Sequence, residues 1–488
     1  MTSRRFLFVI LLGVLVAGAL VAGRASSSPP APDPNAAPMA AAISQASGVW
    51  FCPGLPPTLP HRAGRVTFSN VGNSEADVVI TDLPDKGRAN QVTIQMAANT
   101  VVTRTRDQLG SPGALTVETF GGRVLVEEGL TAPHALETTP CATQTSTHWY
   151  FAAGSTPRGV EQWLVIDNPY ASDAKVDVTL RTNSGVLRPD SIQSLDISRR
   201  SRAVIPVHDL AVRKDRVAVE VAASLGSVVA AQTIVDTATA GTPGVALSMG
   251  SPVAGNDWTF AGATAEPKSS AIVAIANIGS DDAHVDVQAT AQTSKQALAS
   301  ASVTLAPDDV TWLVLGSCTA PTKTPASGTG CVTIPNGVSY SLDVRAEQNV
   351  AIVAQTLTRF RDAPAVVGTV TSPGGVEPAR DWSFGRSRVD GERSTSLSLF
   401  NPGAAPAVVN VGLVHDGKVD KPGALQNVTV PPGRAVTLVV VTRKTTTPDA
   451  ALIISASQPV FVERTILVAD EASTAVGIVV RPAPAATP

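Results

Sequence analysis

The 488-residue chain is poor in charged and aromatic side chains, and each shortage excludes a class of partner. Charged residues make up 16% of the sequence, below the ~25% that is typical of soluble domains, and the formal net charge is only −3. A balance so close to neutral lacks the basic surface on which nucleic-acid binding depends, so we expect no nucleic-acid partner. Aromatic residues, at 4%, leave few rings on which sugars or bases could stack.

The motifs that accompany common catalytic and metal sites are also missing. The sequence contains no HExxH, Gly-x-Ser-x-Gly or Cys-x-x-Cys motif, and neither a P-loop nor a Rossmann fingerprint. The acidic cluster of Asp281, Asp282 and Asp286 lacks the closing Glu of a calcium loop. We therefore predict that the protein is not an enzyme and has no catalytic residue, no cofactor and no metal.

The N-terminus has the features of an export signal. Arg4 and Arg5 precede an uncharged apolar run over residues 6–22, and Gly23 and Ala25 offer small side chains for a cleavage site. Residues 1–25 therefore predict a signal peptide or a signal anchor, with an apolar run at the short limit for a membrane-spanning helix. The two arginines also resemble a twin-arginine signal without its usual spacer residue. By the positive-inside rule, everything after Ser26 lies outside the cytoplasm.

The four cysteines agree with export, because an even number of them in an exported chain suggests disulfides. Cys318 and Cys331 would close a short loop that is rich in Thr, Pro, Ser and Gly. Cys52 and Cys141 would then tie the start of a first repeat to its end. Buried free thiols are the alternative.

A fourfold repeat organises the rest of the chain. Each copy begins with a tryptophan on a predicted strand and continues, 19 or 20 residues later, with an asparagine in a predicted turn. The tryptophans are Trp50, Trp149, Trp258 and Trp382, and the asparagines are Asn70, Asn168, Asn277 and Asn401.

Branched apolar residues stand eight and ten positions after each asparagine, from Val78 and Ile80 in the first copy to Val409 and Val411 in the fourth. Alternating apolar positions beside a turn predict a β-hairpin with one buried face. We expect each tryptophan to fill the core of a β-sandwich, and each asparagine to bond its own downstream backbone.

The second half of each copy has a polar residue inside an otherwise apolar strand. The four residues are Glu127, Gln232, Gln355 and Glu463. Two interpretations are open: a buried hydrogen bond to a neighbouring backbone group, or a contact line shared along one face of the array.

About seven short strands in roughly 100 residues favour an all-β fold of tandem immunoglobulin-like β-sandwich repeats. The rival is a four-bladed β-propeller, whose blades of about 40–50 residues are half as long as these units. We place independent modules in a row at residues 48–140, 141–256, 257–380 and 381–482. A flexible spacer rich in Ser, Pro and Ala (26–47) precedes them, and a disordered tail (483–488) follows.

The export segment and the repeated Trp-x-Phe, Asn, Val-x-Val block of residues 149–178, 258–287 and 382–411 resemble an uncharacterised family of actinobacterial envelope proteins that are secreted or membrane-anchored. The resemblance implies an extracytoplasmic location and brings no assigned reaction. The first repeat departs from the block, with Cys52 close to its tryptophan and Val-Gly after Asn70.

These observations predict a non-catalytic, exported scaffold or protein-interaction protein of the cell envelope. Its expected partners are envelope proteins or cell-wall polymer, with a membrane contact through residues 6–22 if the signal is not cleaved. The alternative is a wall-polymer-binding or glycan-processing protein with a site at a repeat junction.

Overall fold

The computed structural model describes residues 47–59, 63–132, 135–237, 239, 243–292, 297–318, 329–361, 367–388, 394–440, 449–468 and 471–479. The predicted signal segment (1–25), all of the spacer except its last residue, and the tail (483–488) lie outside the described residues. Most of the described residues lie in β-strands and the helices are short, which confirms the all-β prediction. This part of the chain holds no helix with the length and apolarity that crossing a membrane requires.

Repeat 1 (residues 48–140) folds into two antiparallel sheets that share the apolar core of Trp50, Phe68 and Val78. In sheet order, the first consists of β1 (Ser47–Cys52), β6 (Ala114–Gly121), β3 (Ala76–Leu83) and β4 (Asn90–Met96). The second consists of β5 (Thr100–Thr105), β2 (Gly64–Asn70), β7 (Val124–Ala132) and β8 (Ala135–Pro140). The short helix α2 (Arg106–Leu109) follows β5 and begins with a capping box between Thr105 and Gln108.

Repeat 2 (141–256) has the same plan. Its first sheet consists of β9 (His148–Phe151), β15 (Val217–Leu225), β11 (Ala174–Thr182) and two short edge strands, β12 (Gly185–Leu187) and β13 (Leu195–Ile197). Its second sheet consists of β14 (Ser201–Pro206), β10 (Val160–Asn168), β16 (Val229–Asp236) and β17 (Gly244–Met249). The short helices of this repeat are η2 (Asp190–Ile192) and α3 (Val207–Leu210).

Repeat 3 (257–380) adds one strand to the plan. Its first sheet consists of β18 (Asp257–Thr264), β24 (Ser339–Ala346), β20 (Ala283–Ala291) and β21 (Ala297–Leu305). Its second sheet consists of β23 (Thr329–Thr333), β22 (Val310–Gly316), β19 (Ser269–Asn277), β25 (Ile352–Arg361) and β26 (Val367–Pro373). The added strand β23 pairs in parallel with β22 and contains Cys331, which closes the predicted disulfide loop. One short helix, η4 (Glu347–Asn349), precedes β25.

Repeat 4 (381–482) joins its two sheets through one long strand, β33 (Asp449–Val468). The first half of β33 pairs with β27 (Ala379–Arg388) and β29 (Ala407–His415), and β29 also pairs with β30 (Lys418–Asp420) and β31 (Val428–Val430). The second half pairs with β28 (Ser394–Asn401) and β34 (Glu471–Val476), and β28 also pairs with β32 (Arg434–Val440). The remaining elements are η5 (Gly423–Leu425) and β35 (Ile478–Val479).

The β-sandwich is therefore confirmed, whereas its connectivity is not that of an immunoglobulin domain. In repeat 1 the sheet with the Trp strand has the order first, sixth, third, fourth, and the other sheet has the order fifth, second, seventh, eighth. An immunoglobulin constant domain instead pairs its strands as ABED and CFG. The strand pattern of a sequence predicts where strands lie but not which strand each one pairs with. Each unit has two sheets, so it is also not a single-sheet propeller blade.

The four tryptophans lie in the cores of the sandwiches, each at most 2% exposed. In repeats 2, 3 and 4 the indole Nε1 donates a hydrogen bond across the sandwich to a carbonyl oxygen just before β16, at the start of β25 or in the middle of β33. The acceptors are Val228 at 2.7 Å, Ile352 at 3.1 Å and Val460 at 2.9 Å. A buried indole with its N–H satisfied can fill the core without a polar penalty.

The four asparagines form the same turn in every repeat. Each side-chain Nδ2 donates to the carbonyl oxygen four residues later at 2.8 Å, and each Oδ1 accepts from the N–H two residues later. Asn70 makes three more bonds: its Nδ2 donates to the carbonyls of Met96 at 3.5 Å and Ala97 at 3.1 Å, and its Oδ1 accepts from the Arg123 N–H at 3.1 Å. The asparagine thus fixes the turn between the second and third strands.

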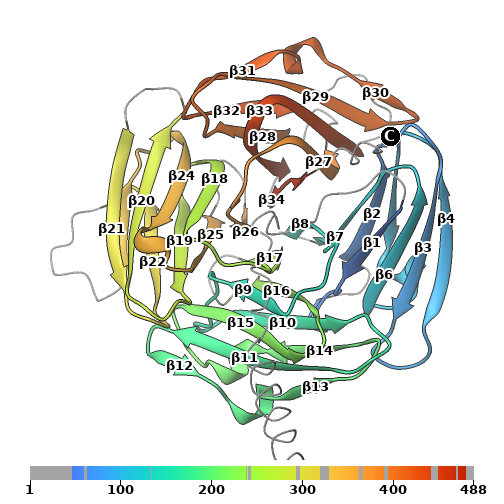
Figure 1. Ribbon diagram of the computed structural model, residues 1–488, viewed down its shortest axis with the longest axis horizontal. Helices are drawn as coiled ribbons and strands as arrows, with labels where there is room; N and C mark the ends of the chain where they lie inside the picture. The colour runs from blue at the N-terminus through green and yellow to red at the C-terminus, as the bar shows by residue number, and fades with distance from the viewer. Residues whose placement is uncertain are drawn as a thin grey trace, which may run out of the picture. The chain divides into compact units, whose positions relative to one another are not determined.

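The repeats are not separate modules in a row, because residues 37–488 form one compact unit. One strand from each repeat contacts the next in the closed order β8, β17, β26, β34 and back to β8, in the middle of the view in Figure 1. Repeat 4 therefore packs against repeat 1 as well as against repeat 3. The expectation of independent modules is not met, because a sequence repeat does not show how the ends of the array meet.

Two disulfides close loops in repeats 1 and 3. Cys52 is bonded to Cys141 and Cys318 to Cys331, which are the pairs that their positions suggested, and no described cysteine is free. Disulfides form and persist in oxidising compartments, so the two bonds suggest an extracytoplasmic protein.

We predict that Asn70→Ala lowers the free energy of unfolding by roughly 3 kcal/mol, because it leaves buried backbone groups without partners. Thermal unfolding followed by circular dichroism measures the effect. Asn73→Ala is the control, because Asn73 is an exposed residue of the same turn. Equal melting temperatures for the two variants would show that the turn does not depend on the asparagine.

Candidate functional site

The recurring polar residue of each repeat lies on the strand that corresponds to β7 of repeat 1. Glu127 is on β7, Gln232 on β16, Gln355 on β25 and Glu463 on β33, and all four are buried. A buried polar side chain needs hydrogen-bond partners, and those partners show what the position does.

Gln355 and Glu463 both reach into the preceding repeat. The Gln355 Oε1 accepts from the Ala153 N–H at 3.1 Å, and its Nε2 donates to Ser248 Oγ at 3.2 Å. In the same way Glu463 Oε2 accepts from the Gly262 N–H at 3.1 Å, while its Oε1 accepts from Ser372 Oγ at 2.9 Å. The backbone N–H groups belong to the strand segment just after the tryptophan of the neighbouring repeat.

Glu127 makes the corresponding contact from repeat 1 to repeat 4 and so closes the cycle. Its Oε1 accepts from the Gly385 N–H at 2.7 Å, and both of its oxygens lie 3.1 Å from Nη1 of Arg464. Glu127 and Arg464 are each 1% exposed, and the Arg464 guanidinium also lies over the Phe384 ring. This buried ion pair joins residues that are 337 positions apart in the sequence.

Gln232 is the exception, because its bonds stay inside repeat 2. Its Nε2 donates to the Ala153 carbonyl at 2.6 Å, and its Oε1 accepts from Gln162 at 2.9 Å. Repeats 1 and 2 are instead joined by Arg202, which donates to the carboxylate of Asp85 and to the carbonyl oxygens of Pro53 and Leu55. The four side chains thus make interior hydrogen bonds to backbone and side-chain groups, and those of Glu127, Gln355 and Glu463 lie between repeats. A contact line along one face of the array stays a prediction.

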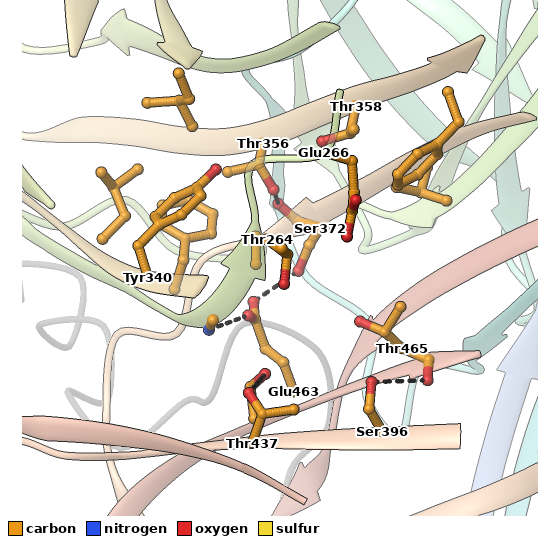
Figure 2. Close-up of a pocket in the computed structure, with 18 residues that line it drawn as sticks. Thr264, Glu266, Tyr340, Thr356, Thr358, Ser372, Ser396, Thr437, Glu463 and Thr465 are labelled. Atoms are coloured by element: carbon orange, nitrogen blue, oxygen red, sulfur yellow. Dashed lines mark hydrogen bonds between the residues drawn. The ribbon is translucent and has the colours of Figure 1, made fainter. Parts of the chain in front are cut away.

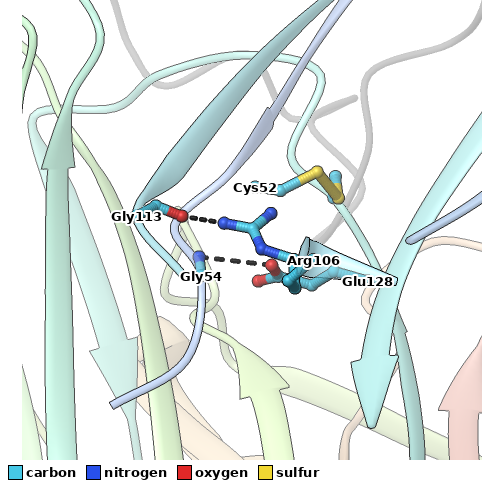
Figure 3. The surroundings of a disulfide bond; sticks show 6 residues. Cys52, Gly54, Arg106, Gly113 and Glu128 are labelled. Carbon is cyan, nitrogen blue, oxygen red and sulfur yellow. Dashed lines mark hydrogen bonds between the residues drawn. A yellow bond between two sulfur atoms is a disulfide. The ribbon is translucent and has the colours of Figure 1, made fainter. Parts of the chain in front are cut away.

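A second cluster of buried charges lies near the Cys52–Cys141 disulfide (Figure 3). Arg106 of α2 donates to the Gly113 carbonyl, and Glu128 of β7 accepts from the Gly54 N–H at 3.2 Å. Asp167 of β10 is fully buried, and neither of its carboxylate oxygens has a hydrogen-bond partner among the described residues. Asp167 precedes Asn168, at a position where the other repeats have Ser69, Ala276 and Phe400.

Burial raises the pKa of Asp167 to about 8, with a smaller contribution from the nearby carboxylate of Glu128, and Arg202 and Arg106 oppose the shift. Burial likewise raises the pKa of Glu128, although the Arg106 guanidinium and the Gly54 N–H favour its charged form. The junction between repeats 1 and 2 therefore buries carboxylates whose charged forms are disfavoured by desolvation.

The junction between repeats 3 and 4 contains a partly enclosed cavity of about 120 Å³. Figure 2 shows side chains of repeat 3, such as Tyr340, Thr356 and Thr358, on one side of it, and Glu463 and Thr465 of repeat 4 on the other. Eight Ser and Thr hydroxyls line the space: Thr264, Thr356, Thr358, Ser372, Ser396, Ser398, Thr437 and Thr465. No Lys, Arg, His or Cys contributes to the lining.

Glu463 therefore both forms hydrogen bonds across the junction and lines the cavity. Burial raises its pKa to about 7, and hydrogen bonds from the Gly262 N–H, Ser372 and the Ala261 N–H hold the shift back. Burial also raises the pKa of the Tyr340 phenol, and the charge of Glu463 adds to that shift. The cavity can therefore present both a neutral hydroxyl and a carboxyl group that titrates near neutral pH.

The residues singled out in the sequence do not gather into one site. The tryptophans and asparagines lie in separate sandwiches and stabilise them, whereas the polar strand positions lie at junctions. No motif in the sequence marks Asp167, Arg202 or Tyr340 as a junction or cavity residue. Asp167 could have been noticed, because it alone is charged at its place in the repeat. Among the described residues, no group of three or more His, Cys, Asp or Glu is placed to hold a metal ion.

An all-β protein of four packed sandwich repeats is the class that this structure defines. Residues 95–372 match a family described as a family of unknown function (DUF5719). Because the match covers more than half of the sequence, the chain belongs to this family. No curated protein matches the sequence.

Three solved structures show limited similarity. Thermotoga maritima 1070 is 16% identical, with 22% of this chain and 94% of that chain covered and a TM-score of 0.20. The Anabaena sensory rhodopsin transducer is 18% identical, with 18% and 88% covered and a TM-score of 0.16. A tetra-tandem repeat from the extending region of a large adhesion protein is 11% identical, with 89% and 99% covered and a TM-score of 0.11. Scores this low give no information on function.

We predict that Glu127→Gln lowers the free energy of unfolding by about 3 kcal/mol or more, because it removes the carboxylate that is hydrogen-bonded to the buried Arg464 guanidinium and leaves only Glu137 as a nearby counter-charge. Adding Arg464→Met should restore part of the loss, as a double-mutant cycle of thermal unfolding would measure. Glu118→Gln, at an exposed position of β6, is the control. If Glu127→Gln unfolds at the same temperature as this control, the ion pair does not hold repeats 1 and 4 together.

We also predict that Asp167→Asn changes the pH dependence of stability. A carboxyl whose pKa is higher in the folded than in the unfolded state stabilises the fold at low pH, and this stabilisation is lost as the pH rises through the folded pKa. Relative to the variant, the wild-type protein should therefore lose stability between about pH 4 and pH 8. Each pKa unit corresponds to about 1.4 kcal/mol, so the difference should amount to several kcal/mol.

Denaturant unfolding at a series of pH values measures this difference. Asp190→Asn, at an exposed position of the same repeat, should give a curve parallel to that of the wild type. A parallel curve for Asp167→Asn as well would show that the Asp167 carboxyl has no raised pKa.

Proposed function

We propose that the chain is a non-catalytic, exported scaffold or protein-interaction protein of the cell envelope. The observation that carries the proposal is the closed packing of the four sandwiches, fastened by buried side chains at each junction. Such packing fixes the outer strands and turns of every repeat relative to one another. A fixed array of surfaces suits a protein that holds partners at defined positions.

The outer edges of the sheets supply surfaces for such partners. β4, β21 and the short strands β12 and β30 each lie at the edge of a sheet, away from its Trp strand. Edge strands carry unpaired backbone groups and are a common site of protein contact. Exposed large apolar residues occur on every repeat, among them Phe120 on repeat 1, Tyr170 on repeat 2 and Val439 on repeat 4.

The two disulfides support an extracytoplasmic location, and the predicted signal at residues 1–25 would provide the route. Retention through residues 6–22 would hold the repeats at the membrane, and cleavage would release them. In either case the expected partners are envelope proteins or cell-wall polymer.

Proximity labelling in living cells, with the labelling enzyme fused after residue 488, tests this proposal. We expect labelled envelope proteins, and we expect them to disappear for a matched chain that lacks residues 1–25. Labelling of cytoplasmic proteins alone by the full-length fusion would refute the proposal. Hydrolysis of cell-wall fragments by the purified repeats would refute its non-catalytic part.

A second candidate is a protein that binds wall polymer or processes glycans at a repeat junction. The cavity between repeats 3 and 4 favours this candidate, because it lies at such a junction and is lined by hydroxyl groups. Both oxygens of Glu463 already accept hydrogen bonds from repeat 3, which favours binding over catalysis. Co-sedimentation of the purified repeats with insoluble cell wall tests this candidate. We expect the repeats in the pellet if they bind wall polymer, and repeats that stay in the supernatant would contradict the candidate.

A further inference from the structure

The cavity between repeats 3 and 4 has one polar and one apolar part. Phe260, Leu342, Phe360 and Val370 provide ring and aliphatic surface, while the Ser and Thr hydroxyls provide groups that both donate and accept hydrogen bonds. Protein sites for small molecules commonly combine apolar walls with a few polar groups that fix orientation.

The charge of the lining restricts the ligand. Glu266 and Glu463 are its only ionisable carboxyl groups, and no basic side chain faces them across the cavity. An anionic ligand would meet no counter-charge there, and a carboxylate would repel it. The hydroxyl groups outnumber the carboxyl groups, which favours a neutral ligand over a cationic one.

The size of the cavity restricts the ligand further. One water needs roughly 10–15 Å³ of such volume, so 120 Å³ holds about ten water molecules. A polymer segment of several units does not fit into this space, but a single sugar ring or a comparable polyol does.

Tyr340 contributes a phenol hydroxyl to the lining. Its side chain is buried, and Figure 2 draws no hydrogen bond between this hydroxyl and another lining residue. Glu463 has lone pairs left after accepting from Gly262 and Ser372, because a carboxylate has about four acceptor positions. A ligand hydroxyl between these two side chains could accept from the phenol and donate to the carboxylate.

We propose that this cavity is a binding site for a small neutral molecule with several hydroxyl groups, of monosaccharide size. The ligand's hydroxyls bond to Tyr340, Glu463 and the Ser and Thr side chains, and its C–H face packs on the Phe260 side of the space. Because the walls come from two repeats, the bound ligand also holds repeats 3 and 4 together. The inference rests on the second candidate function and names its ligand class.

Titration of the purified repeats with a panel of neutral monosaccharides and inositol, followed by saturation-transfer NMR and calorimetry, tests the proposal. An amine cation such as choline and an anionic sugar acid complete the panel. We expect saturable binding of at least one neutral member, together with a rise in melting temperature that grows with its concentration.

Ala263→Trp is the blocking variant, because Ala263 lines the cavity and is itself exposed, so a large side chain there obstructs the space without burying itself in a core. Ala299→Trp is the matched control, at an exposed position of β21 in the same repeat. Affinity should fall at least about tenfold in the first variant and stay at the wild-type value in the second.

Tyr340→Phe removes only the hydroxyl and keeps the ring in the core, so it tests the site even if the blocking variant does not fold. Its affinity should fall about fivefold or more, while Tyr150→Phe in repeat 2 should bind normally. Binding of the neutral ligand that survives Ala263→Trp and Tyr340→Phe unchanged would overturn the proposal. So would the absence of binding by every neutral compound up to about 10 mM, or binding of the amine cation or sugar acid alone.

These results separate from those for the proposed function. Proximity labelling reports the compartment and the neighbours of the protein without depending on the cavity. If the protein labels envelope partners but binds no sugar, only the proposed ligand site is refuted. Sugar binding by a protein with cytoplasmic neighbours alone would refute only the envelope role.

Discussion

The buried hydrogen bond from β7 or its counterpart in one sandwich to the backbone after the tryptophan of another is the interaction on which the rest of the structure depends. Without this bond, the sheets of a sandwich would end in solvent at that point, and the sandwich would be a separate domain. With Gln355, Glu463 and Glu127 each placed at such a junction, the sandwiches instead pack as a single body. The same strand therefore both completes its own sheet and fixes the next repeat. Desolvating these polar groups is costly unless each finds its partner, so the geometry of the junctions is strongly specified.

The repeat itself could be predicted from sequence with little error, because its determinants are local. A tryptophan, an asparagine and two alternating branched residues specify a strand, a turn and a buried hairpin face, and these appear at Trp149, Asn168, Val176 and Val178 as the pattern indicates. Connectivity could not be predicted in the same way. The pairing of the first strand with the sixth is a long-range choice, made by packing among strands whose own patterns are nearly identical.

The junctions could be predicted only in part. Four polar residues inside apolar strands are visible in the sequence, but their partners lie up to 337 positions away and are backbone groups that no residue type marks. Gln232 shows the limit, since it shares the pattern of the other three and yet bonds inside its own repeat. The cavity is harder still to foresee. Its walls combine common Ser and Thr residues from six strands, and none of them is unusual in its own strand.

The ion pair between Glu127 and Arg464 also has a consequence for how the chain is made. A protein is synthesised from its N-terminus, so the surface of repeat 1 that receives repeat 4 stays uncovered until almost the whole polypeptide has emerged. Contacts of such long sequence separation form slowly, and an open surface can pair with the equivalent part of another copy. A chain cut short before residue 464 would keep that surface permanently unmatched. Exchange of repeats between two copies is then the misassembly that this architecture favours. A chain needs its full length to complete the packing of repeat 4 on repeat 1 within one copy.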